Sequence, residues 1–237
     1  MLVQIMNQIL IYIGNDLSSM IATNDPRKSV LILIIQELLQ LGAAILIFKV
    51  FFNRNFSQLG LNLKNKKLSL KIFVAFSIVW LLVIILYYAL VFIFDKSLWN
   101  SLLHYPLPSK EYAVAYIGFE AIFPGLCEET LFRGLILYAL INNGWASRIK
   151  IGKVEISYAA ILTGIIFMCA HIYFRILPFE ITHLNYTQLF MAFSLGIFQA
   201  ITFEKTKSLL SPILTHNFSN LSSTLCGYFV SFIGGHL

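Results

Sequence analysis

Charged residues are scarce in this sequence. Only 12% of its 237 residues are Asp, Glu, Lys or Arg, and 58% are hydrophobic. A soluble domain has about 25% charged and about 45–50% apolar residues, so this composition excludes a water-soluble globular protein. A membrane-spanning helix needs about 20 residues, and the length therefore allows about six to eight spans. We expect an all-α fold, a polytopic membrane helix bundle that forms one domain over residues 1–237.

Cysteine is also rare, and proline and glycine are too few and too scattered to mark a linker between domains. Cys127, Cys169 and Cys226 all lie in apolar stretches, which excludes the disulfide framework of a small secreted protein. Residues 1–20 lack a basic segment and a small-residue cleavage site. They predict a short first span or an interfacial helix rather than a removable signal peptide. Low-complexity tracts and convincing internal repeats are missing as well.

Apolar runs of transmembrane length divide the sequence. The runs at 30–52 and 72–94 are nearly uninterrupted and predict two spans. The later runs carry polar residues, and the last is long enough for one tilted span or a broken pair. These later helical runs are expected at 112–142, 156–174, 188–203 and 208–235.

Basic residues lie mostly between these runs and explain the formal net charge of +6. The connector 53–71 has basic residues and no acid, the connector 143–155 is mainly basic, and Lys205 and Lys207 follow the run 188–203. The alternation predicts that these connectors are cytoplasmic. Basic loops orient a membrane protein and attract anionic lipid, so we expect the lipid bilayer, and no nucleic acid, as a partner.

Ionisable residues inside a membrane are costly and usually line a polar site. Glu128, Glu129 and Arg133 lie within the run 112–142. Glu129 and Arg133 are four residues apart, so they share a helix face and can form an ion pair. Glu128 is rotated by about 100° from Glu129. It is therefore left without that partner and is free to face a cavity.

Two histidines and an asparagine occur in the later runs, at His171, His216 and Asn220. A carboxylate with an imidazole can deprotonate water, which is hydrolytic chemistry. His216 and Asn220 share a helix face and could donate hydrogen bonds to the oxyanion of a tetrahedral intermediate. Glu128, His171 and His216 could alternatively hold a divalent metal such as Zn²⁺ with an open position for water.

Structural roles compete with these catalytic ones. The Glu129–Arg133 pair, a single His or a single Asn can simply hold membrane helices together. Cys127 or Cys169 with His171 as base is a second catalytic arrangement. However, Cys169 lies two positions from His171 and points to the opposite side of its helix, and a thiol in apolar surroundings is inert. The remaining intramembrane acids, Glu37 and Glu120, have no basic partner nearby in sequence, so they line a cavity or pair across helices.

Three motifs in a fixed order carry a family resemblance. EETLFRG fits E-E-x-x-x-R, FMCAH fits F-x-x-x-H and HNFSN fits H-x-x-x-N. With these motifs at membrane depth, the chain resembles the CPBP intramembrane protease family. That family unites type II CAAX prenyl endopeptidases with bacteriocin-processing and self-immunity proteins, long labelled Abi. The resemblance covers about residues 112–225, which we expect to be the catalytic core.

The resemblance implies a role for each motif residue. Glu128 would be the general base that activates water, and Glu129 and Arg133 would support it. His171 would help to bind the water. The oxyanion site would be formed by His216 and Asn220. The family is commonly named a metalloprotease, and a metal-free glutamate mechanism is also proposed for its prenyl endopeptidase relatives, so both remain open.

The resemblance also bears on substrate and location. An Ile-, Asn- and Lys-rich composition is similar to that of short family members from Gram-positive bacteria. We expect a multi-pass protein of a bacterial cell membrane that cleaves a membrane-associated peptide or protein, in bacteriocin self-immunity or secreted-peptide maturation. The enzymatic alternative is a CAAX-type prenyl endopeptidase. A non-catalytic membrane immunity protein and a proton-coupled transporter are further alternatives, although the lack of a paired inverted repeat disfavours transport.

Overall fold

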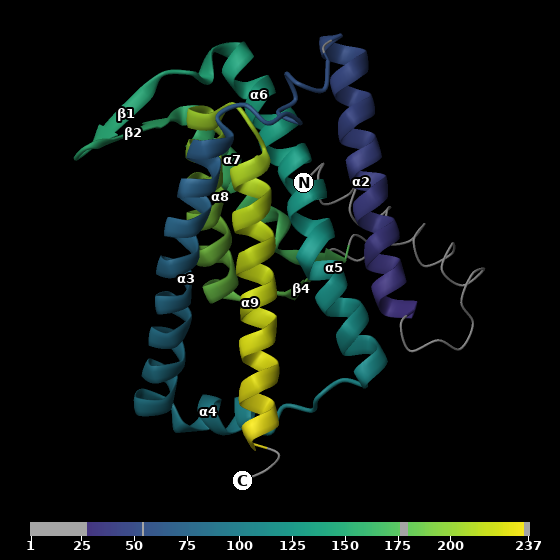
Figure 1. Cartoon of the computed structure of the whole chain (residues 1–237), viewed down its shortest axis with the longest axis vertical. Coiled ribbons are helices and arrows are strands. Elements are labelled where there is room, and N and C mark those ends of the chain that lie inside the picture. Colours follow the sequence, from purple (N-terminus) through teal and green to yellow (C-terminus); the bar gives the residue numbers. More distant parts are fainter. Residues whose placement is uncertain (1–27, 54, 176–179, 235–237) are drawn as a thin grey trace.

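The chain forms a bundle of long helices that run roughly along one axis (Figure 1). A computed structural model describes residues 28–53, 55–175 and 180–234. The short first span or interfacial helix expected within residues 1–20 lies outside the described residues. The longest helices are α2 (Lys28–Phe52), α3 (Lys66–Phe94), α5 (Lys110–Glu129), α8 (Tyr186–Thr206) and α9 (Leu210–Gly234). The predicted all-α membrane bundle is confirmed.

Three helices in the described part are long and apolar enough to cross a membrane, by length and composition. They cover Ser29–Phe52, Lys66–Phe94 and Tyr186–Thr206. The expected number of about six to eight spans is therefore not established. The helix α9 has 25 residues, which is sufficient length, but its His, Asn and Ser residues lower its hydropathy. The polar residues that suggest a site are thus the same ones that weaken the span signal.

Two of the predicted runs contain more local structure than expected. The run 112–142 is helical throughout and passes from α5 into the π-helix η1 (Thr130–Ile136), then α6 (Leu137–Leu140) and the start of η2 (Ile141–Trp145). The helical backbone is broken inside η2, at Asn143 and Gly144. Single π-turns occur frequently at functional sites. The run 208–235 forms the single helix α9, so the alternative prediction of a broken pair of helices is wrong.

The run 156–174 ends earlier than predicted. The helix α7 (Tyr158–Ala170) has 13 residues, about 20 Å of rise, and is too short to cross a bilayer. The chain then enters strand β3 (Tyr173–Arg175), which pairs antiparallel with β4 (Glu180–His183). Ile172, Tyr173 and Phe174 are apolar, so hydropathy alone extends the run past the end of the helix.

The connectors also contain elements that the sequence did not predict. The mainly basic connector 143–155 holds a hairpin of β1 (Arg148–Ile151) and β2 (Val154–Ser157). The connector 95–111 holds the short helix α4 (Lys96–Leu103). Asp95 caps this helix, because its carboxylate accepts a hydrogen bond from the backbone nitrogen of Leu98.

The basic connectors lie at the same end of the bundle (Figure 1). Asn62 and Asn65 donate side-chain hydrogen bonds to the carbonyl oxygens of Lys207 and Thr206. Arg148 of β1 forms an ion pair of 2.5 Å with Glu204 near the end of α8. These contacts agree with the alternation of basic loops that the sequence predicts.

Small residues bring α7 and α8 close together. A Cβ atom on Gly196 would lie 3.0 Å from the Cα atom of Gly164, and one on Gly164 would lie 2.8 Å from the Ile197 side chain. Small residues permit this close approach between membrane helices. The core beside them includes Leu131, Phe132, Phe167 and Ala192. This packing holds α7 and α8 against η1, where Arg133 lies.

Candidate active site

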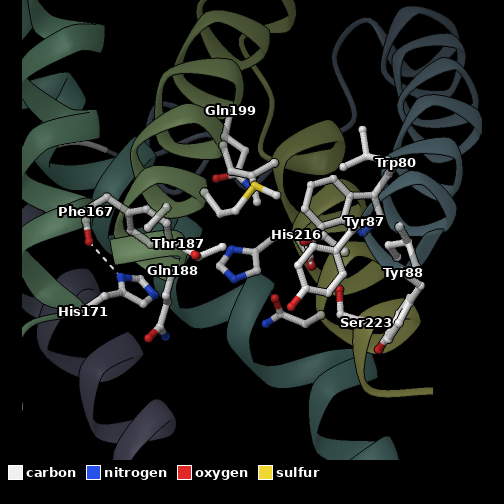
Figure 2. A pocket seen from close by; sticks show the side chains of 17 residues that line it. Trp80, Tyr87, Tyr88, Phe167, His171, Thr187, Gln188, Gln199, His216 and Ser223 are labelled. Atoms are coloured by element: carbon white, nitrogen blue, oxygen red, sulfur yellow. Dashed lines mark hydrogen bonds between the residues drawn. The ribbon is translucent and has the colours of Figure 1, made fainter. Parts of the chain in front are cut away.

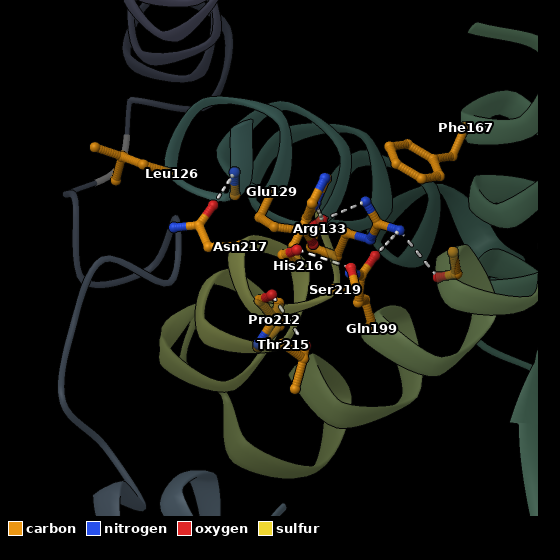
Figure 3. A network of polar contacts seen from close by, with 12 residues as sticks. Leu126, Glu129, Arg133, Phe167, Gln199, Pro212, Thr215, His216, Asn217 and Ser219 are labelled. Atoms are coloured by element: carbon orange, nitrogen blue, oxygen red, sulfur yellow. Dashed lines mark hydrogen bonds and ion pairs between the residues drawn. The ribbon is translucent and has the colours of Figure 1, made fainter. Parts of the chain in front are cut away.

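A fully buried carboxylate stands at the centre of the polar network (Figure 3). The Oε1 atom of Glu129 accepts a hydrogen bond of 3.0 Å from Arg133 Nη1 and one of 2.7 Å from His216 Nδ1. The ion pair that the four-residue spacing predicts is therefore present. The network also extends to α9 through His216, which the sequence could not show.

Arg133 ties two further helices, α7 and α8, to this centre. Its side chain is 0% exposed, and Nη2 donates hydrogen bonds of 2.8 Å to Gln199 Oε1 and of 3.2 Å to the Gly196 carbonyl oxygen. The guanidinium carbon also lies 4.5 Å from the centre of the Phe167 ring. Gln199 escaped the sequence analysis. Its signal was an amide within the apolar run 188–203, away from the ends of that run.

A second asparagine on α9, Asn217, joins this helix to α5 just before the two adjacent acids. The backbone nitrogen of Gly125 donates a 2.7 Å hydrogen bond to Asn217 Oδ1, and Asn217 Nδ2 donates to the Ile122 carbonyl oxygen. Pro124, which has no N–H, lies inside α5 at this point, and proline disturbs the ladder of helix hydrogen bonds. The signal for this contact was a Pro-Gly pair inside the run 112–142.

His171 lies at the point where α7 ends. It is the C-cap residue, and its Nδ1 atom lies 2.9 Å from the Phe167 carbonyl oxygen. A carbonyl oxygen only accepts, so Nδ1 carries the hydrogen and the other ring nitrogen, Nε2, keeps its lone pair in the neutral imidazole. The Phe167 ring lies 4.9 Å from His171 and 5.9 Å from His216, measured between ring centres. Phe167 therefore separates and positions the two imidazoles.

Two cavities meet at His171 and Asn220, which line both. The first, which we call the apolar cavity, has a volume of about 310 Å³ (Figure 2). Its walls come from α3, α7, α8 and α9. His216 lies in this wall beside aromatic and aliphatic side chains. These include Trp80, Val83, Ile84, Tyr87, Tyr88, Phe167, Met191 and Leu195.

The second cavity, which we call the acidic cavity, has a volume of about 300 Å³. Three carboxylates line it, from Glu37 on α2 and from Glu120 and Glu128 on α5. The other polar lining side chains are Gln36, Gln40, Tyr116, His171, Tyr173 and Asn220. The sequence left open whether Glu37 and Glu120 line a cavity or pair across helices, and here they line a cavity.

The structure brings the six sequence-predicted residues into one region with two distinct environments. Glu128 is partly exposed and shares the acidic cavity with His171 and Asn220. His216 shares the apolar cavity with the same two residues. Glu129 and Arg133 are 0% exposed and line neither cavity. The two adjacent acids therefore differ as predicted, one facing a cavity and the other held in an ion pair.

The proposed metal ligands do not form a donor cluster. Within residues 28–53, 55–175 and 180–234, no group of three or more His, Cys, Asp or Glu side chains is arranged to hold a metal ion. The Nδ1 atoms of His216 and His171 are engaged by Glu129 and by a carbonyl oxygen, so Nε2 is the ring nitrogen of each that faces a ligand. The alternative thiol mechanism gains no support either, because Cys127 and Cys169 are absent from the lining of both cavities.

Comparison with known proteins gives one match, over the part of the chain that builds this site. The model of the type II CAAX prenyl endopeptidase Rce1-like family matches residues 110–222. No curated protein and no solved structure gives a significant match. The matched segment contains the three motifs, and the resemblance predicted from those motifs is confirmed.

Proposed function

We propose that this chain, a CAAX-type intramembrane protease by its Rce1-like match over residues 110–222, hydrolyses a peptide bond with Glu128 as the general base. The observation that carries this proposal is the difference in environment between the adjacent acids Glu128 and Glu129. Glu129 is buried and engaged by Arg133 and His216. Glu128 lines a cavity and has no ion pair among the described residues. A general base needs this access to water and substrate.

His171 is suited to hold the attacking water. Its Nδ1 hydrogen is used by the Phe167 carbonyl oxygen, so the Nε2 lone pair can accept a hydrogen bond from a water molecule. Glu128 lines the same cavity and would take the water's other proton. The oxygen would then attack the carbonyl carbon of the scissile peptide bond.

His216 and Asn220 are suited to stabilise the resulting oxyanion. To donate a hydrogen bond from Nε2, His216 must also carry a proton on that nitrogen. The buried carboxylate of Glu129 on Nδ1 stabilises the imidazolium that results. The Asn220 amide offers a second donor from the same face of α9. Loss of one oxyanion donor typically costs about 10²–10³ in rate.

Collapse of the tetrahedral intermediate completes the reaction. The carbon–nitrogen bond breaks, and the proton held by Glu128 passes to the leaving amine. The products are the regenerated Glu128, a carboxylic acid and an amine, and transfer of the acid's proton to the amine gives a carboxylate and an ammonium. This reaction sequence uses only groups of the chain and one water.

The apolar cavity favours a substrate with a bulky apolar group close to the scissile bond. Aromatic and aliphatic side chains dominate its walls, and three of the groups assigned to the chemistry, His171, His216 and Asn220, line it as well. A membrane-associated peptide or protein meets this requirement. We propose that its cleavage serves bacteriocin self-immunity or the maturation of a secreted peptide in a bacterial cell membrane. A prenylated cysteine meets it too, and the family match makes a CAAX-type substrate the second candidate.

The test compares cells that express equal amounts of the wild-type chain, Glu128→Gln or Glu111→Gln. Glu111 is an exposed residue in the first turn of the same helix and serves as the matched control. Membrane and secreted peptides are labelled at their N-termini and identified by mass spectrometry. We expect a product that is present with the wild type and with Glu111→Gln and is lost with Glu128→Gln.

The same cells discriminate the alternatives. An unchanged peptide pattern with a phenotype retained in Glu128→Gln would support a non-catalytic immunity protein. Proton-coupled flux in vesicles without any cleavage would support a transporter. Synthetic peptides with and without a prenyl group on one cysteine then separate the two substrate candidates, because only a CAAX-type enzyme requires the prenyl group.

A further inference from the structure

The acidic cavity contains more carboxyl groups than the proposed reaction uses. Glu120 and Glu128 are eight residues apart on α5, and Glu37 of the neighbouring helix α2 lines the same cavity. Among the described residues, none of these three carboxylates forms an ion pair. Charged groups at membrane depth are costly and mark the path of a substrate or ion.

The two additional carboxylates are deeply buried and incompletely satisfied. Glu37 and Glu120 are 9% and 7% exposed, and the Oε2 atom of each has no hydrogen-bond partner among the described residues. Gln40, which is 3% exposed and lines the same cavity, has an amide nitrogen without a partner. Buried polar atoms normally find partners. The wall therefore offers acceptors for a cation and a donor for a carbonyl group.

A long flexible cation fits this wall better than a metal ion. No set of three donors in the described part of the chain comes together tightly enough for a metal. A lysine ammonium carries three donors on a flexible stem, and an arginine guanidinium carries five in a planar fork. Such a group can reach several carboxylates that surround a cavity of about 300 Å³, and it replaces lost hydration with ion pairs.

We propose that the acidic cavity is a specificity subsite for a lysine or arginine side chain of the peptide substrate. This inference rests on the proposed function, because Glu128 lines the same cavity and places the subsite close to the scissile bond. Glu37 and Glu120 pair with the guest cation, and Glu128 stays available as the base. The enzyme then selects a peptide whose basic side chain enters the acidic cavity when the scissile bond lies near Glu128.

The first arm of the test measures cleavage by the full-length chain in lipid vesicles. The probes are membrane-partitioning synthetic peptides in which each position in turn carries Lys, norleucine or Glu. Norleucine keeps an unbranched apolar stem and removes the ammonium. We expect one position at which Lys raises kcat/KM at least tenfold over norleucine, and at which Glu abolishes cleavage. In Glu37→Gln and Glu120→Gln the ratio of Lys to norleucine should fall towards one, and in Glu111→Gln it should not change.

The second arm measures binding of the same peptides to the Glu128→Gln chain, so that it does not depend on turnover. We expect tighter binding of the Lys peptide than of the norleucine peptide, and loss of that difference when Glu37→Gln is added. Charge-dependent binding without any cleavage by the wild type would overturn the proposed function and keep the cation subsite. Cleavage or binding that is indifferent to Lys at every position would overturn the subsite.

Discussion

His216 of α9 and Glu129 of α5 are joined by a hydrogen bond of 2.7 Å between Nδ1 and Oε1, across 87 residues of sequence. The same carboxylate oxygen accepts from Arg133 at 3.0 Å. The buried carboxylate of Glu129 therefore has two partners. It orients the imidazole of His216, which lines the apolar cavity, and it neutralises the guanidinium of Arg133, which lines neither cavity. This arrangement makes Glu129 a positioning residue, whereas Glu128 faces the acidic cavity.

The same substitution at the two adjacent acids should change the stability of the fold by very different amounts. In Glu129→Gln, Arg133 becomes a buried charge without a counter-ion, which costs about 3–5 kcal/mol of unfolding free energy. In Glu128→Gln, a partly exposed group without an ion pair among the described residues is replaced, and stability should change by less than about 0.5 kcal/mol. Both variants should lose proteolysis. Chemical unfolding of the full-length chain in detergent micelles measures the difference.

A double variant provides the control for this first prediction. Glu129→Gln with Arg133→Met removes both charges, so it should regain more than half of the lost stability and remain inactive. If Glu128→Gln and Glu129→Gln unfold at the same denaturant concentration, the different roles assigned to the two acids are wrong.

Gln199 should contribute to stability through Arg133. It accepts a 2.8 Å hydrogen bond from a fully buried guanidinium, and hydrogen bonds to charged groups contribute about 1.5–3 kcal/mol. Gln199→Leu should lower the unfolding free energy by about that amount. Gln188→Leu on the same helix is the control, because no hydrogen bond of the Gln188 side chain occurs in the described part. Equal losses in the two variants would contradict the prediction.

Local features of this site follow from the sequence, and contacts between distant segments do not. The Glu129–Arg133 pair is predictable because four residues make about one helical turn, and the helices α2 and α3 because their runs are uninterrupted. The contacts of Glu129 with His216 and of Arg133 with Gln199 join separate helices. A single sequence contains no information on that pairing. The early end of α7 is hidden for a different reason, since Ile172, Tyr173 and Phe174, which follow the helix, are apolar.

Two glycines of α5 should behave differently when alanine replaces them. A Cβ atom on Gly125 would meet the Asn217 side chain and lie 2.7 Å from the Ile213 carbonyl oxygen, whereas nothing lies within 4 Å of one on Gly118. Gly125→Ala forces α5 and α9 apart and should cost about 1–3 kcal/mol. Gly118→Ala should instead stabilise by about 0.5–1 kcal/mol, because alanine loses less backbone entropy in a helix.

The measurement for this pair has two parts. Unfolding in micelles gives the stability of both variants, and the rate of peptide cleavage reports whether His216 still reaches Glu129. Gly125→Ala should lower cleavage more than its loss of folded protein explains, since Asn217 follows His216 directly on α9. A Gly125→Ala chain with full stability and full activity would show that the α5–α9 contact does not position the site.

Removal of divalent metal should leave proteolysis unchanged. Glu128, His171 and His216 form no metal-binding cluster in the described residues. We therefore expect at least 80% of the activity to survive dialysis against 1,10-phenanthroline and EDTA (about 0.1 kcal/mol in barrier). Elemental analysis of the purified chain should find far less than one metal per chain. Loss of activity on chelation, with recovery on addition of Zn²⁺, would show instead that substrate binding draws these side chains into a metal site, and Glu128 would then be a ligand or act through a metal-bound water.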